Sequence, residues 1–102
     1  MVDVLAVPTI PITPPTIDEV RDPKAYVSKN IKILSGTMAI NSLDLCAVTI
    51  PAGLDKMGMP VGLQLIARAH SEENLLAVAL AVEKVLGSPL DRLGRPPLGG
   101  AK

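Results

Sequence analysis

Residues 58–66 read Gly-Met-Pro-Val-Gly-Leu-Gln-Leu-Ile, a turn that leads straight into a short apolar run. An apolar run of this length, opened by a proline, is typical of a strand buried in a sheet. Residues 45–50 form a similar run that stops before Pro51. Between the two runs lie four residues that favour turns: Gly53, Asp55, Lys56 and Gly58. The short connection predicts an antiparallel hairpin.

Another apolar run comes early in the chain, at residues 4–7. Its lack of alternation predicts a strand buried on both faces, which needs neighbouring strands. We therefore expect a further part of the protein upstream of Met1. Prolines at positions 8, 11, 14 and 15 exclude helix and interior strand from the next segment. Residues 8–16 are expected to run extended and to wrap a neighbouring part of the fold.

A helix is expected over residues 23–44. Pro23 suits its first turn, and Asp22 precedes it as a candidate N-cap. Apolar residues recur at roughly helical spacing: Tyr26, Val27, Ile31, Ile33, Leu34, Met38 and Ile40. Gly36 lies inside this pattern and marks either a break in the helix or a close packing contact.

The clearest helix lies between Ser71, a favourable N-cap, and Gly87, which suits the position just past a helix end. Its apolar residues cover most of the circumference: Leu75, Leu76, Val78, Ala79, Leu80, Val82, Val85 and Leu86. A helix this apolar is expected to be covered on more than one side, which again indicates a missing partner. The tail over residues 88–102 is rich in proline and glycine and is expected to be irregular.

The composition excludes several classes of function. Ten basic and ten acidic residues leave the 102-residue chain without net charge, and Tyr26 is its only aromatic residue. The chain therefore offers nucleic acid neither a basic patch nor side chains for stacking. It has no run of the roughly 18 apolar residues that a membrane span needs. Because no basic region precedes the first apolar run, we expect no signal peptide. A neutral chain of this hydropathy is expected to be poorly soluble as an isolated monomer.

The single cysteine, Cys46, excludes an internal disulfide, and with one histidine it cannot complete a structural zinc site. We therefore expect a reducing, cytoplasmic setting and no metal or other cofactor. Cys46, His70 and Asp44 could be combined into a Cys–His–acid site, but we favour a buried structural thiol and a surface-loop histidine. Asp44 is expected to cap backbone amides at the helix-to-strand turn or, alternatively, to touch a substrate.

Five segments occur in a fixed order: residues 3–9, the proline-rich stretch, residues 41–51, residues 58–66 and residues 72–76. In this order they resemble the C-terminal part of amidase-signature enzymes, and the resemblance extends to about Leu86. It implies an α/β fold in which a mixed β-sheet packs between helices. Residues 1–87 would form the C-terminal portion of the amidase domain, and residues 88–102 an irregular tail.

The family hydrolyses amide C–N bonds with a Ser–cis-Ser–Lys triad beside a loop rich in glycine and serine. One serine is the nucleophile, and the other passes its proton to the lysine base. The serines of this chain are dispersed, with no two adjacent: Ser28, Ser35, Ser42, Ser71 and Ser88. We therefore assign no catalytic residue and expect this chain alone not to hydrolyse amides.

The resemblance also implies that this part of the family helps to shape the acyl-side pocket. Alignment on Asn41 brings four residues of the first helix nearest to that pocket: Leu34, Thr37, Met38 and Asn41. Alternatively, Asn41 stabilises the turn after the helix. Glutamine-dependent amidotransferases commonly carry an acidic residue where Leu34 stands, so Leu34 argues against that activity. Residues 43–47, Leu-Asp-Leu-Cys-Ala, resemble general amidases and allophanate hydrolases instead.

Three hypotheses follow. The first is the C-terminal segment of an amidase, whose partner is the missing N-terminal catalytic part. The second is a stand-alone structural module that forms a homo-oligomer through its apolar surfaces. The third is one component of a split amidase, in which a separate polypeptide carries the catalytic half.

Overall fold

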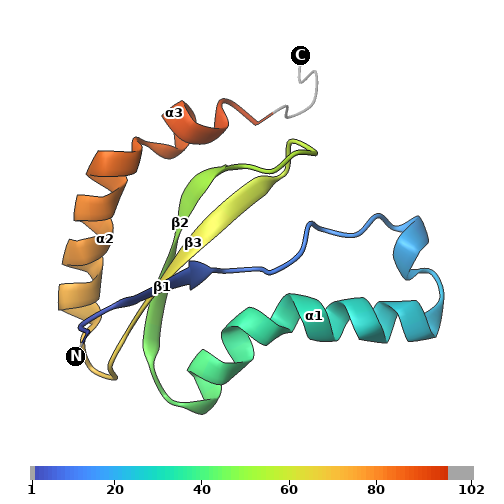
Figure 1. Ribbon diagram of the computed structural model, residues 1–102, viewed down its shortest axis with the longest axis horizontal. Helices are drawn as coiled ribbons and strands as arrows, with labels where there is room; N and C mark the ends of the chain where they lie inside the picture. The colour runs from blue at the N-terminus through green and yellow to red at the C-terminus, as the bar shows by residue number, and fades with distance from the viewer. Residues whose placement is uncertain (1, 97–102) are drawn as a thin grey trace.

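A computed structural model of the chain describes residues 2–96 and has an α/β fold, as the sequence predicts. Figure 1 shows a small sheet with one long helix on each side of it. The elements follow one another in the order β1 (Leu5–Pro8), η1 (Asp18–Val20), α1 (Pro23–Ser42), β2 (Cys46–Leu54), β3 (Pro60–Ala67), α2 (Glu72–Leu86) and α3 (Pro89–Leu93).

The three strands form a sheet in the order β1-β3-β2. β2 and β3 are the expected antiparallel hairpin, with Thr49 opposite Gln64. β1 pairs antiparallel with the other edge of β3, which sets Val7 opposite the same Gln64. All strand pairs within residues 2–96 are antiparallel, so the parallel strands of the mixed sheet implied by the resemblance are not among the described residues.

Two expectations about the strands were wrong. All four residues of β1 are exposed, although their apolar run predicts a strand buried on both faces. β1 is an edge strand of the described sheet, and its apolar side chains are left open there. β2 does not stop at Pro51 but continues to Leu54. Because β2 is the other edge strand, the missing N–H of Pro51 is tolerated, and a register shift between Pro51 and Gly53 accommodates it.

The core lies between α2 and one face of the sheet. Its buried members are Ile50, Leu65, Ala67, Leu75 and Ala79. Alternation along β3 turns Leu65 toward α2 and Gln64 toward the opposite face. The outer side of α2 remains open, since Leu76 and Leu80 are 55% and 59% exposed. The cover that we expected over more than one side of α2 is therefore absent among residues 2–96.

α1 covers part of the face that carries Gln64. Asp22 is its N-cap, as predicted, and the Asp22 carboxylate accepts a hydrogen bond from the amide of Ala25 at 3.0 Å. The helix runs unbroken through Gly36, which confirms the second interpretation of this glycine as a close packing contact. A side chain at Gly36 would collide with the backbone carbonyl of Thr9 in the proline-rich segment.

The prediction of an irregular tail was wrong for its first part. Residues 89–93 form the short helix α3, which packs near β2. Ser88 and Asp91 make a capping box, in which the Ser88 hydroxyl accepts from the Asp91 amide and the Asp91 carboxylate accepts from the Ser88 amide. This local signal is hidden in a segment rich in proline and glycine. Residues 97–102 lie outside the described residues.

Candidate functional site

The four residues predicted for a substrate pocket line one groove. Leu34, Thr37, Met38 and Asn41 share a face of α1 because residues three and four apart in a helix lie side by side. The groove lies between this face and the sheet and has a volume of about 480 Å³. Its remaining lining residues are Ile40, Leu45, Ala47, Thr49 and Gln64.

The sheet supplies two polar residues to the groove, Thr49 and Gln64, which reasoning from the sequence missed. They are direct partners across the β2–β3 hairpin and therefore lie side by side on one face. Gln64 is only 2% exposed, and its Nε2 donates to the carbonyl of Gly36 in α1 at 3.2 Å. The Thr49 hydroxyl lies 3.1 Å from the hydroxyl of Thr9. The position of Gln64 as the one polar residue inside the apolar run 61–66 is the signal that could have identified it.

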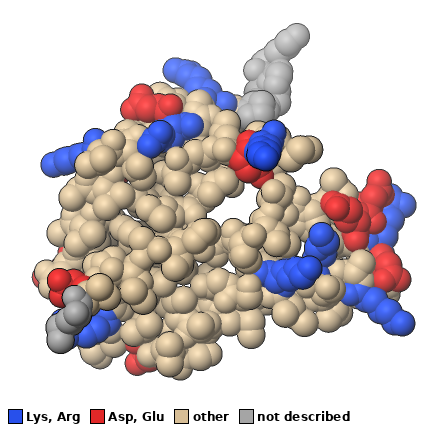
Figure 2. Space-filling model, in the orientation of Figure 1, with Lys and Arg blue, Asp and Glu red and all other residues tan. Residues whose placement is uncertain are grey.

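The groove is electrically neutral. None of its nine lining residues carries an ionisable side chain, and the polar groups are two hydroxyls and two carboxamides. Such a lining binds by apolar contact and by neutral hydrogen bonds, but it supplies no general acid or base. Figure 2 shows a broad face of the molecule without charge, with the charged side chains around its margin.

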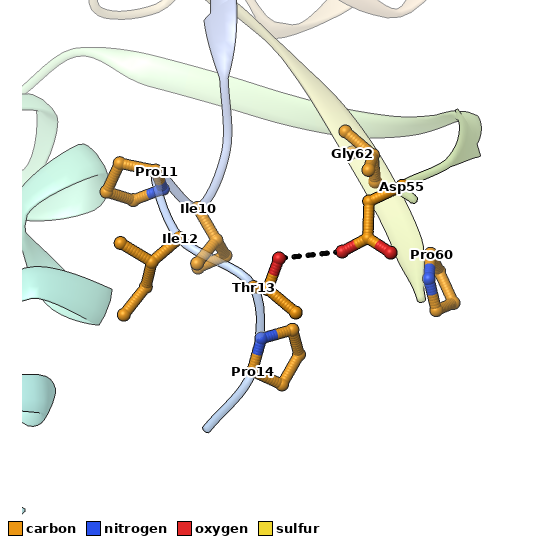
Figure 3. A pocket seen from close by; sticks show the side chains of 9 residues that line it. Ile10, Pro11, Ile12, Thr13, Pro14, Asp55, Pro60 and Gly62 are labelled. Atoms are coloured by element: carbon orange, nitrogen blue, oxygen red, sulfur yellow. Dashed lines mark hydrogen bonds between the residues drawn. The ribbon is translucent and has the colours of Figure 1, made fainter. Parts of the chain in front are cut away.

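A second hollow, of about 240 Å³, lies where the proline-rich segment meets the hairpin turn (Figure 3). The Thr13 hydroxyl donates to Asp55 Oδ2 at 2.8 Å, and Oδ1 accepts from the amides of Met57 and Met59. These hydrogen bonds, first of all that of Met59, lower the pKa of the Asp55 carboxyl below its ordinary value. Asp55 therefore connects the proline-rich segment to the hairpin turn by hydrogen bonds, and these bonds favour its ionised form.

The remaining candidates do not assemble into a site. The Cys46 thiol donates to the backbone carbonyl of Arg68 at 3.0 Å, which suits the structural role that we favoured. His70 is exposed in the loop before α2, as expected. The expectation that the Asp44 side chain caps backbone amides was wrong. Asp44 is exposed with a φ of 53°, and among residues 2–96 no group donates to its carboxylate.

The described part of the chain lacks two further features. Residues 2–96 contain no cluster of three or more His, Cys, Asp or Glu side chains placed to hold a metal ion. In the same part of the chain, no helix combines the length and the apolar character needed to cross a membrane.

Comparison with known proteins identifies relatives over most of the chain. A 2-amino-5-chloromuconic acid deaminase from Comamonas testosteroni is 39% identical over 97 residues, which are 95% of this chain and 21% of that protein. A fatty acid amide hydrolase from Oryza sativa subsp. indica is 41% identical over 86 residues, or 82% of this chain and 14% of that protein. One polypeptide of the glutamyl-tRNA(Gln) amidotransferase of Ruegeria pomeroyi is 49% identical over 51 residues, or 50% of this chain and 10% of that polypeptide.

The chain thus spans about a fifth, or less, of the length of these relatives. The model of the Amidase family matches residues 1–76, which hold all three strands, α1 and the whole groove. The chain therefore belongs to the amidase family.

Proposed function

We propose that this chain forms one wall of the acyl-side pocket of an amide hydrolase. The observation that carries the proposal is that Leu34, Thr37, Met38 and Asn41 line the same neutral groove. The nucleophile and its base come from another part of the amidase fold, because the five serines of this chain are dispersed and no two of them are adjacent.

The open surface of the chain supports a role as part of a larger body. Its accessible surface is 7825 Å². A compact protein of 10.6 kDa exposes roughly 5,500 Å² by the usual scaling with mass. The surplus is larger than the roughly 800 Å² that each partner buries in a typical stable interface. The partner that covers it is the catalytic part of the amidase, either on the same polypeptide or on a second one.

The test is to purify, from the native source, the protein that carries residues 1–102 and to identify every polypeptide in it by mass spectrometry. We expect a lysine and a pair of adjacent serines in the same polypeptide or in one bound to it. We also expect ammonia release from simple primary amides. The recombinant 102-residue chain should release none, and ammonia release by the isolated chain at the rate of the native protein would overturn the proposal.

A second candidate is a self-associating structural module derived from an amidase. It is favoured by the exposed apolar side of α2, on which Leu76 and Leu80 lie one turn apart. A second copy packed against this side would bury the same apolar surface of α2 that the catalytic part covers in the first proposal. A monodisperse homo-oligomer from the native source, without a serine-bearing partner and without ammonia release, would favour this candidate.

A further inference from the structure

Thr9 contacts α1, β2 and β3, the three elements that line the groove, although Thr9 is not itself a lining residue. Its amide donates to the carbonyl of Gly62 in β3 at 3.1 Å. Its carbonyl lies so close to Gly36 in α1 that no side chain fits between them. Its hydroxyl lies 3.1 Å from the hydroxyl of Thr49 in β2, and Thr49 does line the groove.

The backbone of Thr9 is held from two sides. Its amide continues the pairing of β1 with β3 by one residue beyond Pro8. Its carbonyl packs against the backbone of α1 at Gly36. With the backbone fixed, the position of the hydroxyl depends on the χ1 torsion alone, which is restricted in a β-branched side chain. Thr9 therefore presents its hydroxyl to β2 from a rigid support.

The hydrogen bond between the two hydroxyls passes over Gly62. Because β3 is the central strand, Thr9 beside it and Thr49 in β2 lie on opposite sides of β3. A side chain at position 62 would fill the space between them. Its Cβ would lie 2.6 Å from Thr49 Cγ2 and 2.9 Å from Thr9 Oγ1, which is overlap rather than contact. The two threonines meet only because residue 62 has no side chain.

We infer that Thr9 is a positioning residue of the groove, which acts on the ligand through Thr49. Thr49 is exposed, and within residues 2–96 its hydroxyl has no hydrogen-bond partner other than Thr9. Thr9 therefore selects one rotamer of Thr49 and holds its hydroxyl at a fixed place in the groove. A group that is already ordered costs the ligand less to bind. This inference deepens the proposed function and rests on the groove being the acyl-side pocket.

The first test is NMR of the full chain labelled with ¹³C at the threonine methyl groups. The chain has five threonines, so Thr16 and Thr37 serve as internal references. In the unmodified chain, we expect three-bond couplings to show a single χ1 rotamer for Thr49. Thr9→Val keeps the shape of the side chain but removes the hydroxyl, and it should let Thr49 populate several rotamers. Thr9→Ser keeps the hydroxyl and should keep the rotamer of Thr49.

Thr13→Val is the matched control. It removes another threonine hydroxyl from the proline-rich segment, together with a hydrogen bond of 2.8 Å to Asp55. Because Thr13 contacts the hairpin turn and does not line the groove, this variant should lower the melting temperature without changing the rotamer of Thr49. Gly62→Ala is an independent variant, since it removes no hydroxyl but forces the two threonines apart. It should free Thr49 as Thr9→Val does.

The second test is a double-mutant cycle in the native protein that carries residues 1–102, with hexanamide as the substrate. Thr9→Val should raise KM roughly fivefold, the effect of losing one neutral hydrogen bond, with little change in kcat. In a Thr49→Val background the same substitution should have no further effect, because Thr9 acts through the Thr49 hydroxyl. Thr9→Ser should keep KM near its original value, and Thr13→Val should leave it unchanged.

The inference would be overturned by a Thr49 side chain that keeps one rotamer in Thr9→Val, or that already averages in the unmodified chain. An equal rise in KM with and without the Thr49 hydroxyl would also overturn it. Should Thr9→Val not fold, Gly62→Ala and the couplings of the unmodified chain still decide. The NMR result does not depend on hydrolysis. Absence of ammonia release would therefore refute the proposed function alone, whereas a mobile Thr49 in a protein that releases ammonia would refute this inference alone.

Discussion

At the scale of single residues, Asp55 connects two segments that lie far apart in the sequence. Its two carboxylate oxygens join the hairpin turn to Thr13, 42 positions earlier in the chain. The turn also needs Gly58, whose φ of 80° is unfavourable for residues with a side chain. Sequence reasoning identified both as turn residues, but the partner of Asp55 in the proline-rich segment became apparent only in the folded chain.

The Asp55 carboxylate should make stability depend on pH. Its hydrogen bonds to Met59, Thr13 and Met57 lower its pKa in the folded state. Its contribution is therefore complete above the unfolded pKa of about 3.9 and is lost as pH falls through the lower folded pKa. Asp55→Asn should lower the melting temperature at pH 7 and flatten its decline in acid. Thermal unfolding measured between neutral and acidic pH checks this.

Asp44→Asn is the control for the Asp55 variant, since it removes one exposed carboxylate that accepts no hydrogen bond within residues 2–96. It should leave the melting temperature at pH 7 nearly unchanged. The structural role of Asp55 would be refuted if both variants shifted the melting temperature by the same amount.

At the scale of elements, the N-terminal cap of α1 is better defined than its packing against the rest of the chain. None of its 20 residues is buried, so little apolar burial holds it in place within the described chain. Asp22 and Pro23 at its start, both read correctly from the sequence, are typical of a well-defined N-terminus. The burial and the bounds of the two edge strands were mispredicted because their surroundings set them. α3 was missed for another reason: its capping box lies in a segment rich in proline and glycine.

Asp22→Ala should destabilise the chain by about 1 kcal/mol, the usual effect of losing an N-cap hydrogen bond. Urea unfolding followed by far-UV circular dichroism measures the change. Asp22→Asn is the matched control because its amide oxygen can still accept from the Ala25 amide. If the two variants lose equal stability, the charge of Asp22 and not its cap is responsible.

At the scale of the whole molecule, the described chain is open rather than compact. Its radius of gyration is 15.9 Å, whereas a compact domain of 102 residues has one of about 13 Å. Five of the six buried apolar residues of the described chain lie between the sheet and α2, and α1 reaches away from them (Figure 1). Ile66 is the exception, since alternation along β3 turns it to the opposite face. The two sides of the sheet are therefore expected to differ in local stability.

Hydrogen exchange should resolve this difference. In the isolated chain, we expect the amides of α1 to exchange well before those of β3 and α2, because α1 has no buried residue and the other two form the core. Mass spectrometry of peptic fragments measures the order. In the native protein, α1 should gain protection if a partner covers it. Equal protection of α1 and β3 in the isolated chain would contradict a core that lies between the sheet and α2 alone.

Local patterns were enough to predict the hairpin, both long helices, the cap at Asp22 and the resemblance to amidases, because each depends on residues close together in the chain. The four groove residues of α1 were identified from that resemblance, and their helical spacing explains why they share a face. The two polar residues that the sheet adds to the groove could not be predicted in the same way. Thr49 and Gln64 meet only through strand register, and Gln64 reaches Gly36 only because α1 folds back across the sheet. Contacts between such distant residues depend on how the elements pack, which no short stretch of sequence encodes.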